Sequence, residues 1–274
     1  MNCIFCKSES ASSRSVEHII PESIGNLEHV LPAGVVCDTC NSYFSTKVEK
    51  PLLDTPYMRD MCFRAQITNK KGHLPFVTGL HLQSRLPVAV YPNMDGEGLS
   101  IASLYQNDEQ RWIRSVLTSG HGSLLIPIPA EPGEQLLSRF VAKVALEALA
   151  LRLIDVDGWN NEIIEKCELD PLREYARRGK GPFWPLNTRR IHPADFLFVE
   201  AEKEPYEVIH EWTFLYTLQH ELYFVLSLFG NEYAINMGGP EIDGYRRWLS
   251  EHGDRSPLYP EGLKSIDRDR EPHR

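Results

Sequence analysis

Two Cys-x-x-Cys pairs near the start of the chain constrain its folding more than any other feature of the sequence. The pairs are Cys3/Cys6 and Cys37/Cys40, and the whole chain of 274 residues holds 6 cysteines. Each pair can wrap two thiolates around one metal ion, and this spacing is typical of a tetrahedral structural zinc site. A unit of roughly 50 residues has little hydrophobic core. We therefore expect Zn²⁺ to supply much of its folding free energy.

The sequence favours a reducing compartment. It contains no apolar run of about 18 residues that would predict a membrane span. Residues 1–7 lack the charged and then apolar stretch of a signal peptide. We expect a cytoplasmic protein with no membrane partner, whose thiols stay reduced. Cys62 and Cys167, which lie outside the two pairs, are then expected to be core thiols.

The residues around the cysteine pairs predict a ββα arrangement. A short apolar segment, residues 16–20, is followed by a strand-like segment at 34–36. Residues 40–50 then favour a short helix, for which Asp38 is a suitable N-cap and Pro51 a suitable end.

Two sequence motifs carry a resemblance to a known family. Residues 17–21 read Glu-His-Ile-Ile-Pro, and Asn41 directly follows the second cysteine pair. This combination resembles the HNH (ββα-metal) endonucleases, especially the zinc-stapled branch that includes phage endonuclease VII. The resemblance covers residues 3 to about 50. It implies a metal-dependent endonuclease that hydrolyses phosphodiester bonds in DNA by a one-metal mechanism.

The resemblance also implies roles for individual residues. His18 matches the general base, Glu17 the metal-binding acid and Asn41 the last family position, which also binds the metal. The side-chain oxygens of Glu17 and Asn41 suit a catalytic Mg²⁺ or Mn²⁺. The middle asparagine of the family, which braces the loop carrying the base, has only two weakly placed candidates, Asn26 and His29.

The positions of Glu17 and His18 raise a geometric question. Adjacent residues of a strand point to opposite faces, yet both side chains are expected to approach one ion. We therefore expect a bend or a bulge at this point of the strand.

Charge gives mixed indications about a nucleic-acid partner. The net charge of −9 disfavours a protein coated in positive potential. One segment nevertheless concentrates cations, with Glu174 as its only acid, and these cations could contact phosphates. They are Arg173, Arg177, Arg178, Lys180, Arg189 and Arg190. The alternative is a solvated helix end, where cations complement the helix dipole.

The remaining residues predict an α+β chain with antiparallel strands. We expect an N-terminal HNH zinc module at 1–55, a mixed α+β targeting or regulatory domain at 56–250, and a charged, disordered tail at 251–274. The clearest helix is expected at 134–155 and a second at 160–178. Aromatic-rich strands at 212–218, 222–229 and 233–236, with a turn at 230–231, are expected to form a sheet on the first helix.

Three functional hypotheses follow from this sequence. The first is a DNA endonuclease, by analogy of architecture with restriction and anti-phage effectors. The second is a noncatalytic zinc-stapled protein that binds DNA or regulates. The third is a nuclease switched by a regulatory ligand or protein partner bound to residues 56–250. A homo-oligomer is compatible with each of them.

Overall fold

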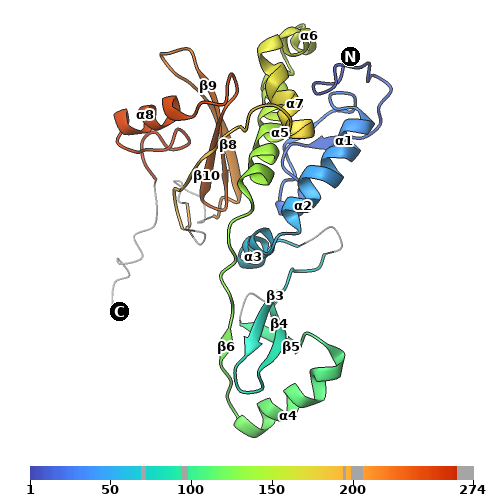
Figure 1. Cartoon of the computed structure of the whole chain (residues 1–274), viewed down its shortest axis with the longest axis vertical. Coiled ribbons are helices and arrows are strands. Elements are labelled where there is room, and N and C mark those ends of the chain that lie inside the picture. Colours follow the sequence, from blue (N-terminus) through green and yellow to red (C-terminus); the bar gives the residue numbers. More distant parts are fainter. Residues whose placement is uncertain (69–71, 94–97, 194–195, 199–205, 264–274) are drawn as a thin grey trace. The chain divides into compact units, whose positions relative to one another are not determined.

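The computed structural model describes residues 1–68, 72–93, 98–193, 196–198 and 206–263 (Figure 1). Over these residues the chain is α+β with antiparallel sheets, as the sequence predicts. The chain divides into two compact units. One joins Met1–Leu52 to Gly133–Arg274, and the other is Leu53–Pro132. No helix in the described part of the chain is long and apolar enough to cross a membrane.

The N-terminal module has the predicted ββα order, but its second strand lies at Val30–Leu31 and not at residues 34–36, which form a turn. Its elements are the paired strands β1 (Glu17–His18) and β2 (Val30–Leu31), the short η1 (Glu22–Ile24), and the successive helical segments α1 (Asp38–Phe44), η2 (Ser45–Glu49) and α2 (Lys50–Leu53). The N-cap of α1 is Cys37 rather than Asp38. Pro51 does not end the helix, because the preceding η2 is a π-helical turn that already interrupts the regular hydrogen-bond ladder.

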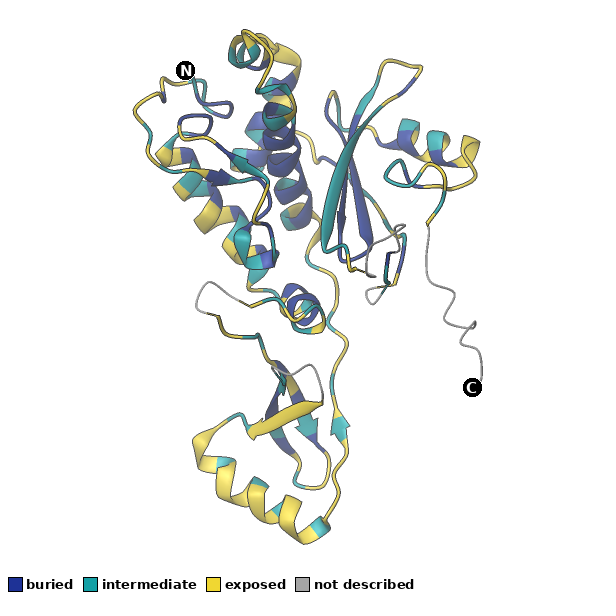
Figure 2. Ribbon diagram, turned by 180° about the vertical axis from the view of Figure 1, so that it is seen from behind, coloured by how far each residue is buried: buried dark blue, intermediate teal, exposed yellow. Residues whose placement is uncertain are grey.

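Helix α5 (Glu134–Leu153) confirms the clearest helix prediction and is the centre of the larger unit. It is buried on most of its surface (Figure 2), as expected for a helix that is apolar nearly all round. Strand β2 and η2 of the N-terminal module pack against it, and so does strand β10 (Asn231–Asn236) of the C-terminal sheet. Helix α5 therefore joins the module to the rest of this unit.

The C-terminal sheet has four antiparallel strands in the order β7-β10-β9-β8. The strands not yet given bounds are β7 (Asn187–Arg190), β8 (His210–Tyr216) and β9 (Leu222–Leu228). The predicted packing of these strands on α5 is confirmed through β10. Helix α8 (Asp243–Glu251) contributes Tyr245 and Leu249 to a hydrophobic core with Tyr223 and Val225.

The turn between β9 and β10 is displaced by one residue from the prediction. Phe229 and Gly230 both have positive φ, at 52° and 77°, which is the backbone that a type I′ hairpin turn requires.

The predicted helix at 160–178 is divided into two. Helix α6 (Trp159–Glu165) ends before Lys166, whose backbone is extended, and η4 (Cys167–Leu169) leads into α7 (Asp170–Arg178). Pro171 lies in the first turn of α7, where the missing N–H of a proline is not needed for a helical hydrogen bond. Cys167 is exposed, so its assignment as a core thiol is wrong, whereas Cys62 is buried as expected.

The unit Leu53–Pro132 has its own small core. Its elements are α3 (Pro56–Arg64), β3 (Val77–His81), β4 (Leu86–Pro92), β5 (Leu99–Ser103), η3 (Gln106–Asp108), α4 (Glu109–Ser119) and β6 (Leu124–Leu125). Its antiparallel strands have the order β5-β4-β3-β6. Val77, Val88 and Val90 form the buried core, and Phe63 and Trp112 pack against it.

The compact units are divided differently from the domains that the sequence suggests. Residues 133–263 share a unit with the N-terminal module because α5 packs against β2 and η2. The predicted disordered tail does not begin at residue 251, since Ser256 is buried and its hydroxyl donates a hydrogen bond to Glu232. Residues 264–274 of that tail lie outside the described residues.

Candidate metal centre and nuclease site

The four paired cysteines come together as the sequence predicts. The sulfur atoms of Cys3, Cys6, Cys37 and Cys40 all lie within 4.8 Å of one another, and Cys6 Sγ is 3.7 Å from Cys37 Sγ. Zinc–sulfur bonds of about 2.3 Å in a tetrahedron place neighbouring sulfurs roughly 3.8 Å apart. The cluster therefore fits a structural metal ion such as zinc.

Local backbone geometry prepares this site for thiolates. Cys3 Sγ accepts a hydrogen bond from the Cys37 backbone N–H (3.3 Å), and Cys37 Sγ accepts one from Cys40 N–H (3.4 Å). The Cys40 thiol and backbone N–H groups donate to Cys3 and lower its pKa to about 4, although burial opposes the shift. At least one sulfur is thus already suited to binding a cation.

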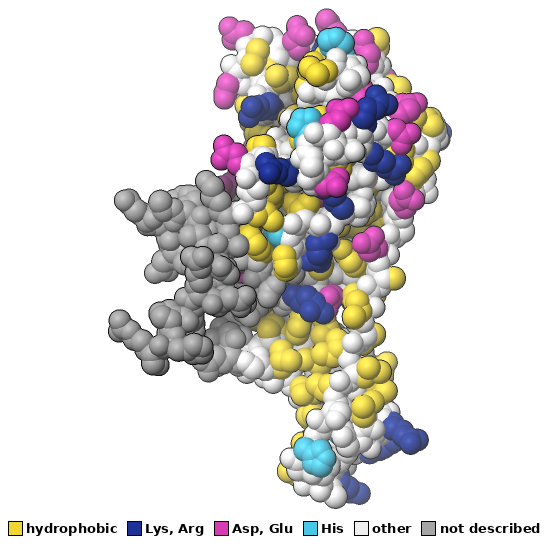
Figure 3. Space-filling view, turned by 90° about the vertical axis from the view of Figure 1, so that its left-hand side faces the viewer, with side chains coloured by type: hydrophobic (Ala, Val, Ile, Leu, Met, Phe, Trp, Pro, Cys, Tyr) yellow, Lys and Arg dark blue, Asp and Glu magenta, His cyan; other side chains and the backbone are white. Residues whose placement is uncertain are grey.

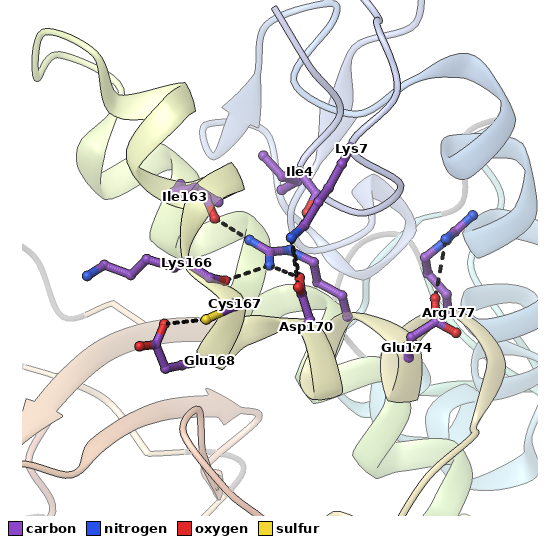
Figure 4. Close-up of polar contacts among 10 residues, drawn as sticks. Ile4, Lys7, Ile163, Lys166, Cys167, Glu168, Asp170, Glu174 and Arg177 are labelled. Carbon is purple, nitrogen blue, oxygen red and sulfur yellow. Dashed lines mark hydrogen bonds and ion pairs between the residues drawn. The ribbon is translucent and has the colours of Figure 1, made fainter.

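Arg173 holds the first cysteine pair against α6 and α7. Figure 4 labels its partners Ile4, Ile163, Lys166 and Asp170. The Arg173 guanidinium donates to the Ile4 carbonyl (2.8 Å), the Lys166 carbonyl (3.0 Å) and the Ile163 carbonyl. It also pairs with Asp170 at 2.5 Å. Because Ile4 lies between the two cysteines of the first pair, this network fixes the metal site to helices that begin more than a hundred residues later.

Asn26 braces the loop that follows β1. Its side chain is fully buried and donates to the carbonyls of Ile20 (2.7 Å) and His29 (3.0 Å). Its Oδ1 accepts from the backbone N–H groups of Glu28 (3.2 Å) and His29 (2.9 Å). Of the two candidates for the bracing asparagine, Asn26 makes these contacts with its side chain.

His18 lies on β1, opposite Val30 of β2, and is half-buried. Its Nδ1 atom is buried and has no hydrogen-bond partner among the described residues. The imidazole is therefore not committed to a structural hydrogen bond through this nitrogen.

Glu17 occupies a different environment from His18. It is 5% exposed, and its Oε1 lies 2.6 Å from the Nζ of Lys143 on α5. Glu49 and Glu147 contact the same ammonium at 2.6 and 2.8 Å. Burial raises the pKa of the Glu17 carboxyl, and Lys143 offsets this only in part. The sequence did not single out Lys143 as a partner of Glu17, because its position in the pattern predicts only that it belongs to the helix α5.

Asn41 lies in the first turns of α1, at a shallow polar groove. Its Nδ2 donates to the Val16 carbonyl (3.1 Å), which ties the start of α1 to the residue before Glu17. The groove has a volume of about 430 Å³, and Arg14, Asp38 and Thr46 are among its lining residues. Arg14, which the sequence did not single out, places an exposed cation beside Asn41.

The predicted basic patch is divided among several roles. Arg173 is 2% exposed, and its guanidinium donates to the Ile4 carbonyl inside the protein. The expectation of a phosphate contact is therefore wrong for this residue. Arg189 pairs with buried Glu232 at 2.5 Å. Arg177 and Arg178 lie 3.7 and 3.5 Å from Glu174, which fits the dipole-complementing alternative.

Lys180 and Arg190 are exposed. On the face seen in Figure 3, acidic and basic side chains are interspersed and form no single basic field.

The N-terminal part of the chain matches one known family. Residues 3–56 match the family model described as HNH endonuclease. No curated protein and no solved structure matches the chain. The matched residues contain the cysteine cluster, His18, Asn26 and Asn41. Residues 3–56 therefore form a module similar to the HNH endonucleases, and its four cysteines are positioned to bind a metal ion.

Proposed function

We propose that this protein is an endonuclease that hydrolyses phosphodiester bonds in DNA, with His18 as the general base. The observation that carries the proposal is the environment of His18 within the matched HNH module. Its Nδ1 has no hydrogen-bond partner among the described residues, while Asn26 braces the loop that follows it. A half-buried histidine on a supported strand, whose Nδ1 is not engaged in a structural hydrogen bond with the described residues, suits proton transfer.

The chemistry assigned to these residues is limited to proton transfer and binding. His18 accepts a proton from a water molecule as the water oxygen bonds to phosphorus, and the bond from phosphorus to the leaving oxygen breaks. Arg14 lies beside Asn41 in the exposed groove. Its guanidinium suits a phosphate oxygen. An ion held by the four cysteines would have no open position for substrate, because four thiolates would complete its coordination.

The expected catalytic Mg²⁺ or Mn²⁺ fits the described residues only in part. Asn41 offers a half-buried carboxamide at the groove. Glu17 does not fit, because its carboxylate is buried and already contacts Lys143. We assign no step of the reaction to this ion.

The contact between Glu17 and Lys143 also favours a second candidate function. An HNH module whose expected acid is engaged elsewhere is compatible with a noncatalytic zinc-stapled protein that binds DNA or regulates. The two functions differ in whether DNA is cut after it is bound.

One labelled DNA duplex and the zinc-loaded full chain distinguish these functions. Gel-shift assays without added divalent ion measure binding, and denaturing gels with Mg²⁺ or Mn²⁺ measure cleavage. The nuclease proposal predicts strand cleavage that requires the added ion. Binding without cleavage under every condition supports the noncatalytic alternative. Weak cleavage that rises strongly when a partner is added supports the switched effector.

A further inference from the structure

We propose that Glu17 is a positioning residue and not a ligand of the catalytic ion. Together with Lys143 it fixes strand β1, and therefore His18, against helix α5. The inference rests on the proposed function in one respect, which is that His18 is the catalytic base.

The first support is the coordination of the Lys143 ammonium. Its Nζ lies within ion-pair distance of three carboxylates, at 2.6 Å from Glu17, 2.6 Å from Glu49 and 2.8 Å from Glu147. An ammonium group has only three donors. The hydrogen bond that Lys143 donates to Glu17 takes up one of these donors, and Glu17 is one of the three carboxylates paired with this ammonium.

The second support is burial. The side chain of Lys143 is 0% exposed, and those of Glu17, Glu49 and Glu147 are 6%, 14% and 0% exposed. A divalent ion that took Glu17 as a ligand would have to enter this site beside an ammonium of the same charge sign. Coulomb repulsion between two cations at such short range is strong away from water. Although three carboxylates surround it, the Lys143 ammonium already occupies the closed site beside Glu17 that a divalent ion would have to enter.

The third support is the direction of the two neighbouring side chains. Successive residues on a strand point to opposite faces. Glu17 is buried at α5, whereas His18 is half-buried and pairs across the hairpin with Val30. The bend that would bring both side chains to one ion is not needed if Glu17 binds α5 and His18 acts at the substrate.

The carboxylate contact also connects residues far apart in sequence. Glu17 and Lys143 are 126 positions apart. Glu49 belongs to η2, so the same ammonium contacts both the hairpin and the helix of the module. A shift of Lys143 is expected to move both, and with them the residue that follows Glu17.

The test uses NMR of the histidine side chains in the zinc-loaded full chain, with the His18 signal assigned by its loss in His18→Ala. Glu17→Gln keeps the shape of the side chain and an oxygen that accepts from Lys143, but a carboxamide is a much weaker cation ligand. Glu17→Ala removes the contact. Glu28→Gln is the matched control, an exposed glutamate of the same hairpin.

The proposal predicts that the His18 signal is displaced in Glu17→Ala and stays at its wild-type position in Glu17→Gln and Glu28→Gln. Added Mn²⁺ is expected to broaden the His18 signal equally in wild type and Glu17→Gln. DNA cleavage should fall by about 100-fold in Glu17→Ala and by less than about threefold in Glu17→Gln, as for a misplaced but intact base.

Two results would overturn the proposal. An unchanged His18 signal in folded Glu17→Ala would show that Glu17 does not position His18. Loss of the Mn²⁺ effect in Glu17→Gln, with Glu28→Gln unaffected, would show that Glu17 is an ion ligand. If Glu17→Ala does not fold, a displaced His18 signal in Glu17→Gln overturns the claim and an unchanged one supports it. Absence of cleavage by wild type would count against the proposed function, while the signal positions would still decide the role of Glu17.

Discussion

Replacing Arg173 by methionine should destabilise the protein severely without acting on DNA binding directly. The change keeps an unbranched apolar side chain but removes every donor of the guanidinium. It leaves the carbonyls of Ile4, Ile163 and Lys166 without this partner, and Asp170 without one of its cations. A buried polar group that loses its partner costs about 1–3 kcal/mol.

Two of these hydrogen bonds, to Ile4 and Ile163, are fully buried. We therefore expect the free energy of unfolding to fall by about 4 kcal/mol, within the range for breaking a buried charged network. Urea unfolding of the zinc-loaded protein measures this change. Because Ile4 lies within the first cysteine pair, a chelator should also remove zinc faster from the variant.

Arg178→Met is the matched control, because Arg178 is half-exposed and lies 3.5 Å from Glu174. Surface ion pairs contribute about 0–1 kcal/mol, so the control should change stability by less than about 1 kcal/mol. The reasoning is refuted if Arg173→Met keeps wild-type stability and zinc retention but binds DNA more weakly. That result would restore Arg173 to the phosphate-contacting patch that the sequence suggested.

Three further predictions concern the core, the metal site and pH. Phe44→Ala should lower the free energy of unfolding by about 3–5 kcal/mol in urea denaturation. The buried Phe44 ring packs on the Phe5 ring, with 4.4 Å between the two ring centroids. A loss below about 1 kcal/mol would contradict this packing. Cys37→Ser should lose the bound zinc measured by atomic absorption, whereas Cys62→Ser should keep it, since Cys62 is outside the cluster. Burial and the nearby charge of Glu232 raise the pKa of Glu211 to about 7 from its ordinary 4.5. The folded state therefore binds this proton more tightly, so this group makes the free energy of unfolding fall as pH rises from about 4.5 to about 7. Denaturant titrations across this range should show a steeper fall in wild type than in Glu211→Gln.

Local sequence signals were sufficient for the metal cluster and for α5. Cysteine spacing predicts which thiolates can share one ion, and the continuous apolar pattern over 134–155 predicts a buried helix. The helix pattern is continuous in the chain, and the cysteine pairs are recognisable from their own spacing although Cys6 and Cys37 are 31 positions apart. The match over residues 3–56 agrees with the motif around Glu17 and His18.

Long-range pairing decided what the sequence could not show. The partner of Glu17 is 126 residues away, and Arg173 contacts Ile4 across 169 residues. A cation in a run of cations resembles a phosphate-binding residue until its position in the fold shows that it is buried. Packing of α5 against the N-terminal module likewise changes the domain boundaries, which no local composition marks.

Cleavage of supercoiled plasmid by wild type and His18→Ala tests the central claim most directly. Both proteins are compared at equal zinc content, with Mg²⁺, with Mn²⁺ and without a divalent ion. The account predicts ion-dependent nicking by wild type and a loss of at least about 100-fold in His18→Ala. Equal cleavage by the two proteins would contradict the assignment of His18 as base. No cleavage by folded, zinc-loaded wild type would contradict the proposal that the purified protein is a nuclease.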